Sequence, residues 1–323
     1  MNHHSLESLI RDVGEHLHGA RQPRWAAAII DPFVHDPIDD GFAKDLGATK
    51  LRINVPLRDK VSSRLPYALL LESTSHGVAL LHTTCLEALE EQRDPDREAQ
   101  HGFAIGPWIA FDSDPSDVVR HWAAICTIRV ATQGRRYLRL TDRRVLKWLW
   151  SRLDSAQQAY VAGPMTHILV LGRDLSVTDL NVPMPPQQET SALSWSFDLT
   201  MLDECEAVQS MLRGWQRFAP SLPENYLEQA QFALSEARAA GAQGLHDQVL
   251  LGAYVLQVDN YVFRSPELRS LVSASQAQAV NLALALSAIP DSRWDAMAMS
   301  VRQDGSVARH QETTQGERRH GFR

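Results

Sequence analysis

The sequence predicts an α+β protein in which a mixed α/β N-terminal lobe, with a small sheet and a hairpin, is followed by an α-helical C-terminal lobe. Between residues 25 and 171, short apolar runs bounded by proline, glycine or aspartate recur as buried strands do. Beyond residue 201, long segments with apolar residues at helical spacing follow one another. The hydrophobic fraction of 44% and the charged fraction of 22% are typical of a chain that folds around a sizeable core.

Changes in composition and periodicity along the chain predict five regions. They are an N-terminal helix at 1–20, an α/β domain at 21–182, a linker and short strand at 183–200, a helical lobe at 201–300 and a flexible tail at 301–323. The prolines of 183–188 indicate the linker, and an aromatic patch at 194–197 indicates the strand. The polar composition after residue 301 indicates the tail.

In the first part of the chain, helical spacing of leucine, isoleucine and valine predicts a helix at residues 6–17, which Gly19 can end. Strands are expected at residues 25–30, 67–71, 103–111 and 166–171. The third strand contains Gly106 and Pro107 and should therefore bend. Residues 82–92 are a candidate helix and residues 94–100 are expected to form a charged loop, whereas residues 36–55 show no clear pattern.

The segment from residue 114 to 164 has the clearest local signals. Asp114 can cap the free amides of a helix that begins with Pro115. Alternating residues on both sides of a turn at Gly134 predict a hairpin over 127–141. Asp142 is a candidate N-cap for the next helix, and a further helix at 155–162 should end at Gly163. The helical lobe is expected to hold helices at 202–218, 224–240, 246–258 and 267–286.

Composition also limits location and partners. The net charge of −7, with the two signs interspersed, gives no continuous basic stripe, so nucleic acid is not an expected partner. Cys85, Cys126 and Cys205 are far apart, which suits a reducing compartment. The apolar runs are far shorter than the roughly 20 residues that cross a bilayer, and no signal-peptide core follows Met1. We therefore expect a cytoplasmic protein with no membrane partner.

The sequence holds none of the familiar catalytic motifs, such as a nucleophile elbow, a phosphate-binding glycine loop or a zinc-binding HExxH helix. Its thirteen histidines invite a metal site, but His16 and His18 point to different faces of a helix, and His3 and His4 lie at the terminus. We expect no catalytic residues, no cofactor and no metal.

The helix with His121, the hairpin about Gly134 and the segment 138–146 resemble the core of the bacterial type VI secretion effector-adaptor (chaperone) family, whose domain was first catalogued as one of unknown function. The family signature reads Phe-Arg-Phe-Tyr-Asp-Pro-Arg-Val-Leu, and it is followed by a helix that ends in Gly-Pro. The positions of this chain that match are His121, Arg139, Asp142, Arg144, Val145, Leu146, Gly163 and Pro164. Those that depart from the signature are Trp122, Leu138, Leu140, Thr141 and Arg143.

The resemblance implies that residues 21–182 are an adaptor domain and that the protein is not an enzyme. Such an adaptor binds one toxic effector protein, commonly by its N-terminal segment, and loads it onto the VgrG spike or its tip protein. The signature residues are then mainly structural. Trp148 and Trp150 lie about 200° apart on one short helix, so one of them is a candidate partner-binding residue, since interfaces favour tryptophan. The alternative, which we favour, is that the helical region covers both. A groove between the two lobes is the expected place for the effector.

Two other functions remain open from the residues alone. A hydrolase or transferase could use His121 as a general base near Asp142 or Asp112, with Arg144 in the same pocket. An immunity-type protein would bind a toxin to block it. We favour a structural role for His121, bonded to the neighbouring hairpin, and a capping role for Asp142, paired with Arg139 or Arg144.

Overall fold

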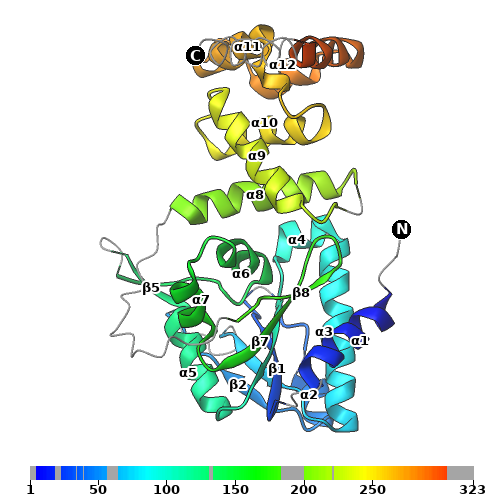
Figure 1. Cartoon of the computed structure of the whole chain (residues 1–323), viewed down its shortest axis with the longest axis vertical. Helices are drawn as coiled ribbons and strands as arrows, with labels where there is room; N and C mark the ends of the chain where they lie inside the picture. The colour runs from blue at the N-terminus through cyan, green and yellow to red at the C-terminus, as the bar shows by residue number, and fades with distance from the viewer. Residues whose placement is uncertain are drawn as a thin grey trace, which may run out of the picture. The chain divides into compact units, whose positions relative to one another are not determined.

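The computed structural model describes residues 5–18, 23–33, 35–38, 40–56, 65–130, 134–182, 200–219 and 222–303 (Figure 1). The chain divides into two compact units. The first comprises Met1–Met201 with Pro220–Leu222, and the second comprises Leu202–Ala219 with Pro223–Arg323. The described part of the first unit is mixed α and β and that of the second is helical, which confirms the predicted fold class.

A six-stranded antiparallel sheet forms the centre of the first unit, in the order β2-β3-β1-β4-β7-β8. Its strands are β1 (Trp25–Ile30), β2 (Lys50–Arg52), β3 (Tyr67–Leu70), β4 (Ile105–Phe111), β7 (Met165–Leu171) and β8 (Val177–Asp179). Nearly all residues of β1, β3 and β4 are buried, because both faces of the sheet are covered. These strands are therefore continuous apolar runs, and the strand predictions at 25–30, 67–71, 103–111 and 166–171 are confirmed.

Strand β4 contains the predicted bend. Its register with β1 shifts between Ala28 and Ile30, so that Gly106 and Pro107 together oppose one residue of β1. Such a bulge tolerates a proline inside a sheet, because the bulged residues leave the regular hydrogen-bond ladder. A Cβ atom on Gly106 would lie 2.2 Å from the carbonyl oxygen of Thr141. Glycine here therefore lets the chain before α6 pack directly on the central strand.

Seven helices and a hairpin complete the described part of the first unit. The helices are α1 (Leu6–His18), α2 (Asp40–Asp45), α3 (Ser75–Arg93), α4 (Pro95–His101), α5 (Pro115–Ile125), α6 (Arg143–Trp150) and α7 (Ser155–Ala162). The hairpin strands β5 (Thr127–Val130) and β6 (Gly134–Tyr137) form a separate two-stranded sheet. Helices α5, α6 and α7 begin after Asp114, Asp142 and Asp154, whose carboxylates accept hydrogen bonds from the first free amides. The predicted caps at Asp114 and Asp142 are thus confirmed.

Two predictions about the first unit are wrong in detail. Helix α3 begins at Ser75 rather than at residue 82, because Thr74 caps it by accepting a hydrogen bond from the amide of Gly77 at 3.1 Å. Residues 94–100 are not a loop but lie mostly in α4, whose cap is Asp94 and whose first residue is Pro95. The unassigned segment 36–55 contains α2 and β2.

The second unit holds α8 (Thr200–Gln216), α9 (Tyr226–Ala239), α10 (Leu245–Gln257), the 3-10 helix η2 (Val262–Arg264), α11 (Pro266–Gln276) and α12 (Leu282–Ser287), and residues 291–303 are also helical. The single helix predicted at 267–286 is wrong. It breaks after Gln276, since Gln278 has a φ of 58° and Asn281 caps a new helix by accepting from the amide of Leu284 at 3.1 Å. Of the predicted linker and strand at 183–200, residues 183–199 lie outside the described residues and residue 200 begins α8. Of the predicted flexible tail at 301–323, residues 301–303 are helical, which corrects the prediction there, and the rest lies outside the described residues.

Candidate functional site

The charged residues of the signature segment lie inside the first unit, where they meet carboxylates from distant parts of the chain. Four arginines and four carboxylates form what we call the buried ion network: Arg139, Arg143, Arg144 and Arg173 with Asp31, Glu91, Glu98 and Asp142. All four carboxylates are buried. Equal numbers of the two charges make the network neutral as a whole, which is the condition for charges to remain in a protein interior.

Asp142 both caps α6 and anchors two arginines. Its Oδ1 accepts from the Arg144 amide at 3.0 Å and from Nε of the same residue at 2.9 Å, while Oδ2 accepts from Nη2 at 2.6 Å. Arg139 Nη1 lies 3.7 Å from the same carboxylate. Burial alone would raise the pKa of Asp142, but the charges of Arg144 and Arg139 hold this pKa well below its usual range. Asp142 is therefore ionised at neutral pH, and its two oxygens are bonded to the amide and the guanidinium of Arg144.

Glu98 connects three elements. It lies on α4, accepts two hydrogen bonds from Arg173 at 2.7 and 2.9 Å, and also accepts one from Arg144 Nη1. Arg173 follows β7, whereas Arg144 belongs to α6. Burial would raise the pKa of Glu98, yet the two arginines lower it overall. This pairing fixes α4 against α6 and the end of β7.

Arg143 and Glu91 form another deeply buried pair. Arg143 Nη1 donates to Glu91 Oε2 at 2.8 Å, and Nη2 donates to the carbonyl of Ala88 at 3.0 Å. The remaining carboxylate oxygen of Glu91 accepts from the amides of Ala104 at 2.6 Å and Ile105 at 3.2 Å. The signature has proline at the position of Arg143, so this departure adds a link between α6, α3 and the start of β4.

Asp31, directly after β1, receives three donors on one oxygen. Its Oδ2 accepts from Arg139 Nε at 2.7 Å, from the Tyr137 hydroxyl at 2.8 Å and from the Thr141 hydroxyl at 2.8 Å. Thr141 is another position that departs from the signature. The departing positions Trp122, Leu138, Leu140, Thr141 and Arg143 are all buried. Their differences from the family therefore change packing inside the unit.

One aromatic ring lies among the cations. The guanidinium carbons of Arg143, Arg144 and Arg173 are 4.0, 4.2 and 6.0 Å from the ring centroid of buried Phe103. A ring face attracts cations through its quadrupole. Phe103 thus contributes to holding three arginines close together, and the network as a whole joins β1, α3, α4, β7 and α6.

His121 lies outside this network. Its Nε2 donates to the carbonyl of Val161 at 2.9 Å, and burial lowers the pKa of the imidazole although that hydrogen bond opposes the shift. The ring is therefore neutral at pH 7 with its proton on Nε2. The partner of His121 is the end of α7 and not the hairpin, which corrects the sequence-based expectation. Asp112, a proposed partner, instead accepts from the amide of Arg24 at 3.0 Å.

Gly163 is required beside His121. Its φ is +50°, and a Cβ atom there would lie 2.4 Å from His121 Nε2. The matched positions Gly163 and Pro164 therefore end α7 and leave room for the imidazole. Of the other matched residues, Leu146 is buried and Val145 is half-buried on α6.

We predict that Gly163→Ala lowers the free energy of unfolding by about 2 kcal/mol, because it adds steric overlap to backbone strain. The matched control is Gly134→Ala, which has a similar φ of +72° but nothing within 4 Å of the new Cβ atom, so strain alone should cost about 1 kcal/mol. Urea unfolding of both variants measures the difference. Equal losses in the two variants would show that the His121 contact has no effect.

Both tryptophans of α6 are buried, with 0% of Trp148 and 7% of Trp150 exposed. Trp148 Nε1 donates to the carbonyl of Met201 at 3.3 Å, and the Arg152 guanidinium stacks on its ring. A role for either tryptophan in partner binding stays a prediction, and it requires the side chain to become accessible.

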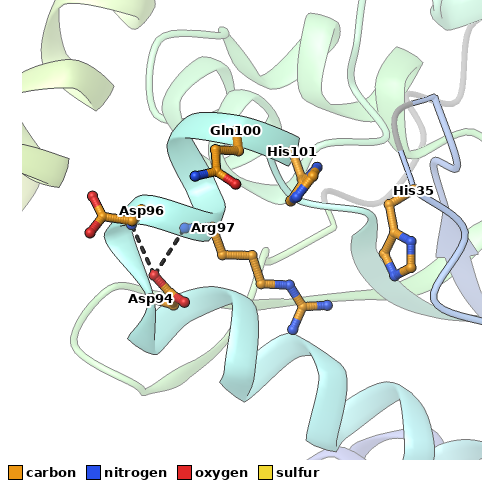
Figure 2. A pocket seen from close by; sticks show the side chains of 6 residues that line it. All are labelled: His35, Asp94, Asp96, Arg97, Gln100 and His101. Atoms are coloured by element: carbon orange, nitrogen blue, oxygen red, sulfur yellow. Dashed lines mark hydrogen bonds between the residues drawn. The ribbon is translucent and has the colours of Figure 1, made fainter.

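The outer side of α4 lines a pocket of about 380 Å³. Figure 2 shows its six side chains: His35, Asp94, Asp96, Arg97, Gln100 and His101. Asp94 accepts from two backbone amides of α4, and Arg97 pairs with Glu87 at 2.8 Å and Glu90 at 3.3 Å. The polar groups of Asp94 and Arg97 are thus already bonded to neighbouring residues. Within the described ranges, no three histidine, cysteine or acidic side chains gather as a metal site requires, and no helix there could cross a membrane.

Comparison with known proteins finds one similarity, which covers a part of the chain. No curated protein and no solved structure matches. Residues 60–160 match a family described as "Domain of unknown function (DUF4123)". This stretch contains six of the eight charged residues of the buried ion network, while Asp31 and Arg173 lie outside it. The segment that carries the signature of the effector-adaptor resemblance is thus similar to the DUF4123 family.

Proposed function

We propose that the protein is an adaptor, or chaperone, that binds a type VI secretion effector in the cytoplasm and loads it onto the VgrG spike. The observation that carries this proposal is the match of residues 60–160 to DUF4123, a family associated with such adaptors. The partners are then the effector, by its N-terminal segment, and the spike or its tip protein. The protein itself is not an enzyme.

The physical character of the signature supports a binding role. Its charged residues pair with one another inside the first unit, so they rigidify five elements. A rigid surface binds a partner at lower entropic cost than a flexible one, which suits a protein that must hold its cargo and then release it.

The enzyme alternative has less support from the contacts. His121 is bonded to Val161 and lies beside Gly163, whereas Asp142 and Arg144 are bonded to each other and to other members of the network. A general base and its orienting carboxylate need a direct hydrogen bond or one bridging water. His121 thus belongs to one set of contacts, and Asp142 and Arg144 belong to another. The hydrolase or transferase hypothesis would need these residues in one pocket.

Co-purification tests the proposal. The tagged full chain would be expressed with any toxin and VgrG genes found beside its gene, and we expect both proteins to co-purify with it. Deleting the gene should abolish secretion of that toxin, and the wild-type chain should restore it. Recovery of the toxin without the spike would favour an immunity-type protein. Recovery of neither, or a gene far from any spike or toxin gene, would contradict the adaptor.

A further inference from the structure

As far as the described residues go, both edges of the β5–β6 hairpin are open. Its strands form a two-stranded sheet of their own, apart from the six-stranded sheet (Figure 1), and within the described ranges no third strand pairs with either. The outer edge of each strand therefore offers backbone amides and carbonyls to an added strand. Natural proteins usually cover or blunt such edges, and several peptide-binding domains use them to bind an extended segment.

The hairpin is also basic. Residues 127–137 contain Arg129, Arg135 and Arg136 but no aspartate or glutamate, although the whole chain has a net charge of −7. Arg135 on β6 is exposed. An exposed guanidinium on a strand that carries no carboxylate can donate charge-assisted hydrogen bonds to an anionic group. The charge of the hairpin thus favours an anionic partner.

The base of the hairpin is fixed to the first unit. The Tyr137 hydroxyl donates to Asp31 at 2.8 Å, the Thr127 hydroxyl donates to the carbonyl of Ala123 at 2.7 Å, and Ile128 is buried. The amide of Leu138, just after β6, donates to the carbonyl of Cys126, just before β5, at 2.8 Å. Strands held in this way keep their open edges in place before a partner arrives, which lowers the cost of binding.

We infer that the hairpin docks an extended acidic segment of the cargo. The segment adds to an open edge through backbone hydrogen bonds, and its carboxylates accept charge-assisted hydrogen bonds from Arg135. Strand β6 has four residues, so the pairing portion of the segment is similarly short. This inference rests on the proposed function, because it specifies the chemistry of the cargo that the adaptor would bind.

A defined peptide tests this inference with the full chain. The probe is a fluorescent peptide of alternating glutamate and valine, eight residues long and blocked at both ends, and the comparison peptide has lysine in place of glutamate. Anisotropy should show salt-sensitive binding of the glutamate peptide only. Arg135→Glu should weaken that binding at least about tenfold. The matched control Arg120→Glu changes an arginine on α5 that is 74% exposed, and it should leave binding unchanged.

Several results would overturn the inference: no binding of the glutamate peptide to the wild-type chain, equal binding to Arg135→Glu, or tighter binding of a mixed-sequence DNA duplex. The last would show a site for nucleic acid, and equal binding would show that the arginine only blunts an open edge. The peptide measurement does not depend on the effector. If the effector co-purifies equally with the wild-type chain and with Arg135→Glu, that result contradicts this inference alone. If the effector does not co-purify with the wild-type chain, that result contradicts the proposed function.

Discussion

Replacing Arg143 with methionine should lower the free energy of unfolding by about 3–5 kcal/mol, the largest loss that we expect from a single change. The substitution keeps the apolar stem but leaves the carboxylate of Glu91 buried without its cation. The carbonyl of Ala88 also loses its donor. Denaturant unfolding followed by tryptophan fluorescence and by far-UV circular dichroism would measure the loss.

A double variant distinguishes an uncompensated charge from lost packing. In Arg143→Met with Glu91→Gln, the buried group is neutral and can still accept from the amides of Ala104 and Ile105. We therefore expect the double variant to be more stable than Arg143→Met alone. Glu90→Gln, one residue away on the exposed side of α3, should change the free energy by less than about 0.5 kcal/mol. If the double variant loses as much free energy of unfolding as Arg143→Met alone, lost packing rather than an uncompensated charge is the cause.

Acid should destabilise the first unit through Asp142 and Glu98. Their folded-state pKa values lie below the unfolded values of about 3.9 and 4.3, so their ionised forms contribute stability that is complete above about pH 5. That contribution is lost as the pH falls through the unfolded values towards the folded ones. Asp142→Asn should lower the free energy of unfolding by about 2–3 kcal/mol at pH 7 and flatten its decline between pH 5 and pH 3.

The control for this pH dependence is another aspartate cap. Asp114 caps α5 as Asp142 caps α6, but it is exposed, and asparagine is an equally good cap. Its hydrogen bonds with Ser116 also lower the pKa of Asp114, but this carboxylate is exposed, so Asp114→Asn should alter the pH profile far less than Asp142→Asn does. Urea unfolding at several pH values would compare the three proteins. If Asp142→Asn and the wild type gave parallel profiles, the ionised network would not be the source of the acid sensitivity.

Local signals in the sequence predict much of the fold. Asp114 and Pro115 predict the start of α5, and the same Asp-Pro pair at residues 94 and 95 begins α4. The second pair was available as a signal, but the surrounding charges resemble those of a loop. The break between α11 and α12 was harder to find, because Gln278 adopts a positive φ that glutamine rarely has.

The candidate site could be predicted only in part. The segment itself indicates that Asp142 caps a helix and pairs with Arg144, since cap and arginine are neighbours in sequence. Glu91, Glu98 and Asp31 could not be found in this way, because their arginine partners are distant in sequence. The partners of Glu91 and Glu98 lie 46 to 75 residues away, and Arg139 lies 108 residues from Asp31. No periodicity links such positions. The departure from proline at Arg143 is the one local sign that an unusual contact forms there.

We expect the span of the ion pairs to limit how short a folding fragment of this chain can be. Asp31 and Arg173 lie on either side of residues 60–160, and so do β1 and β7, the two neighbours of β4 in the sheet. An excised fragment limited to the matched stretch would keep Arg139 and Glu98 but lose a partner of each, along with both strands that flank β4. We therefore expect the cooperative unit to be longer than the stretch that matches DUF4123, and expression fragments should extend from before Trp25 to beyond Arg173.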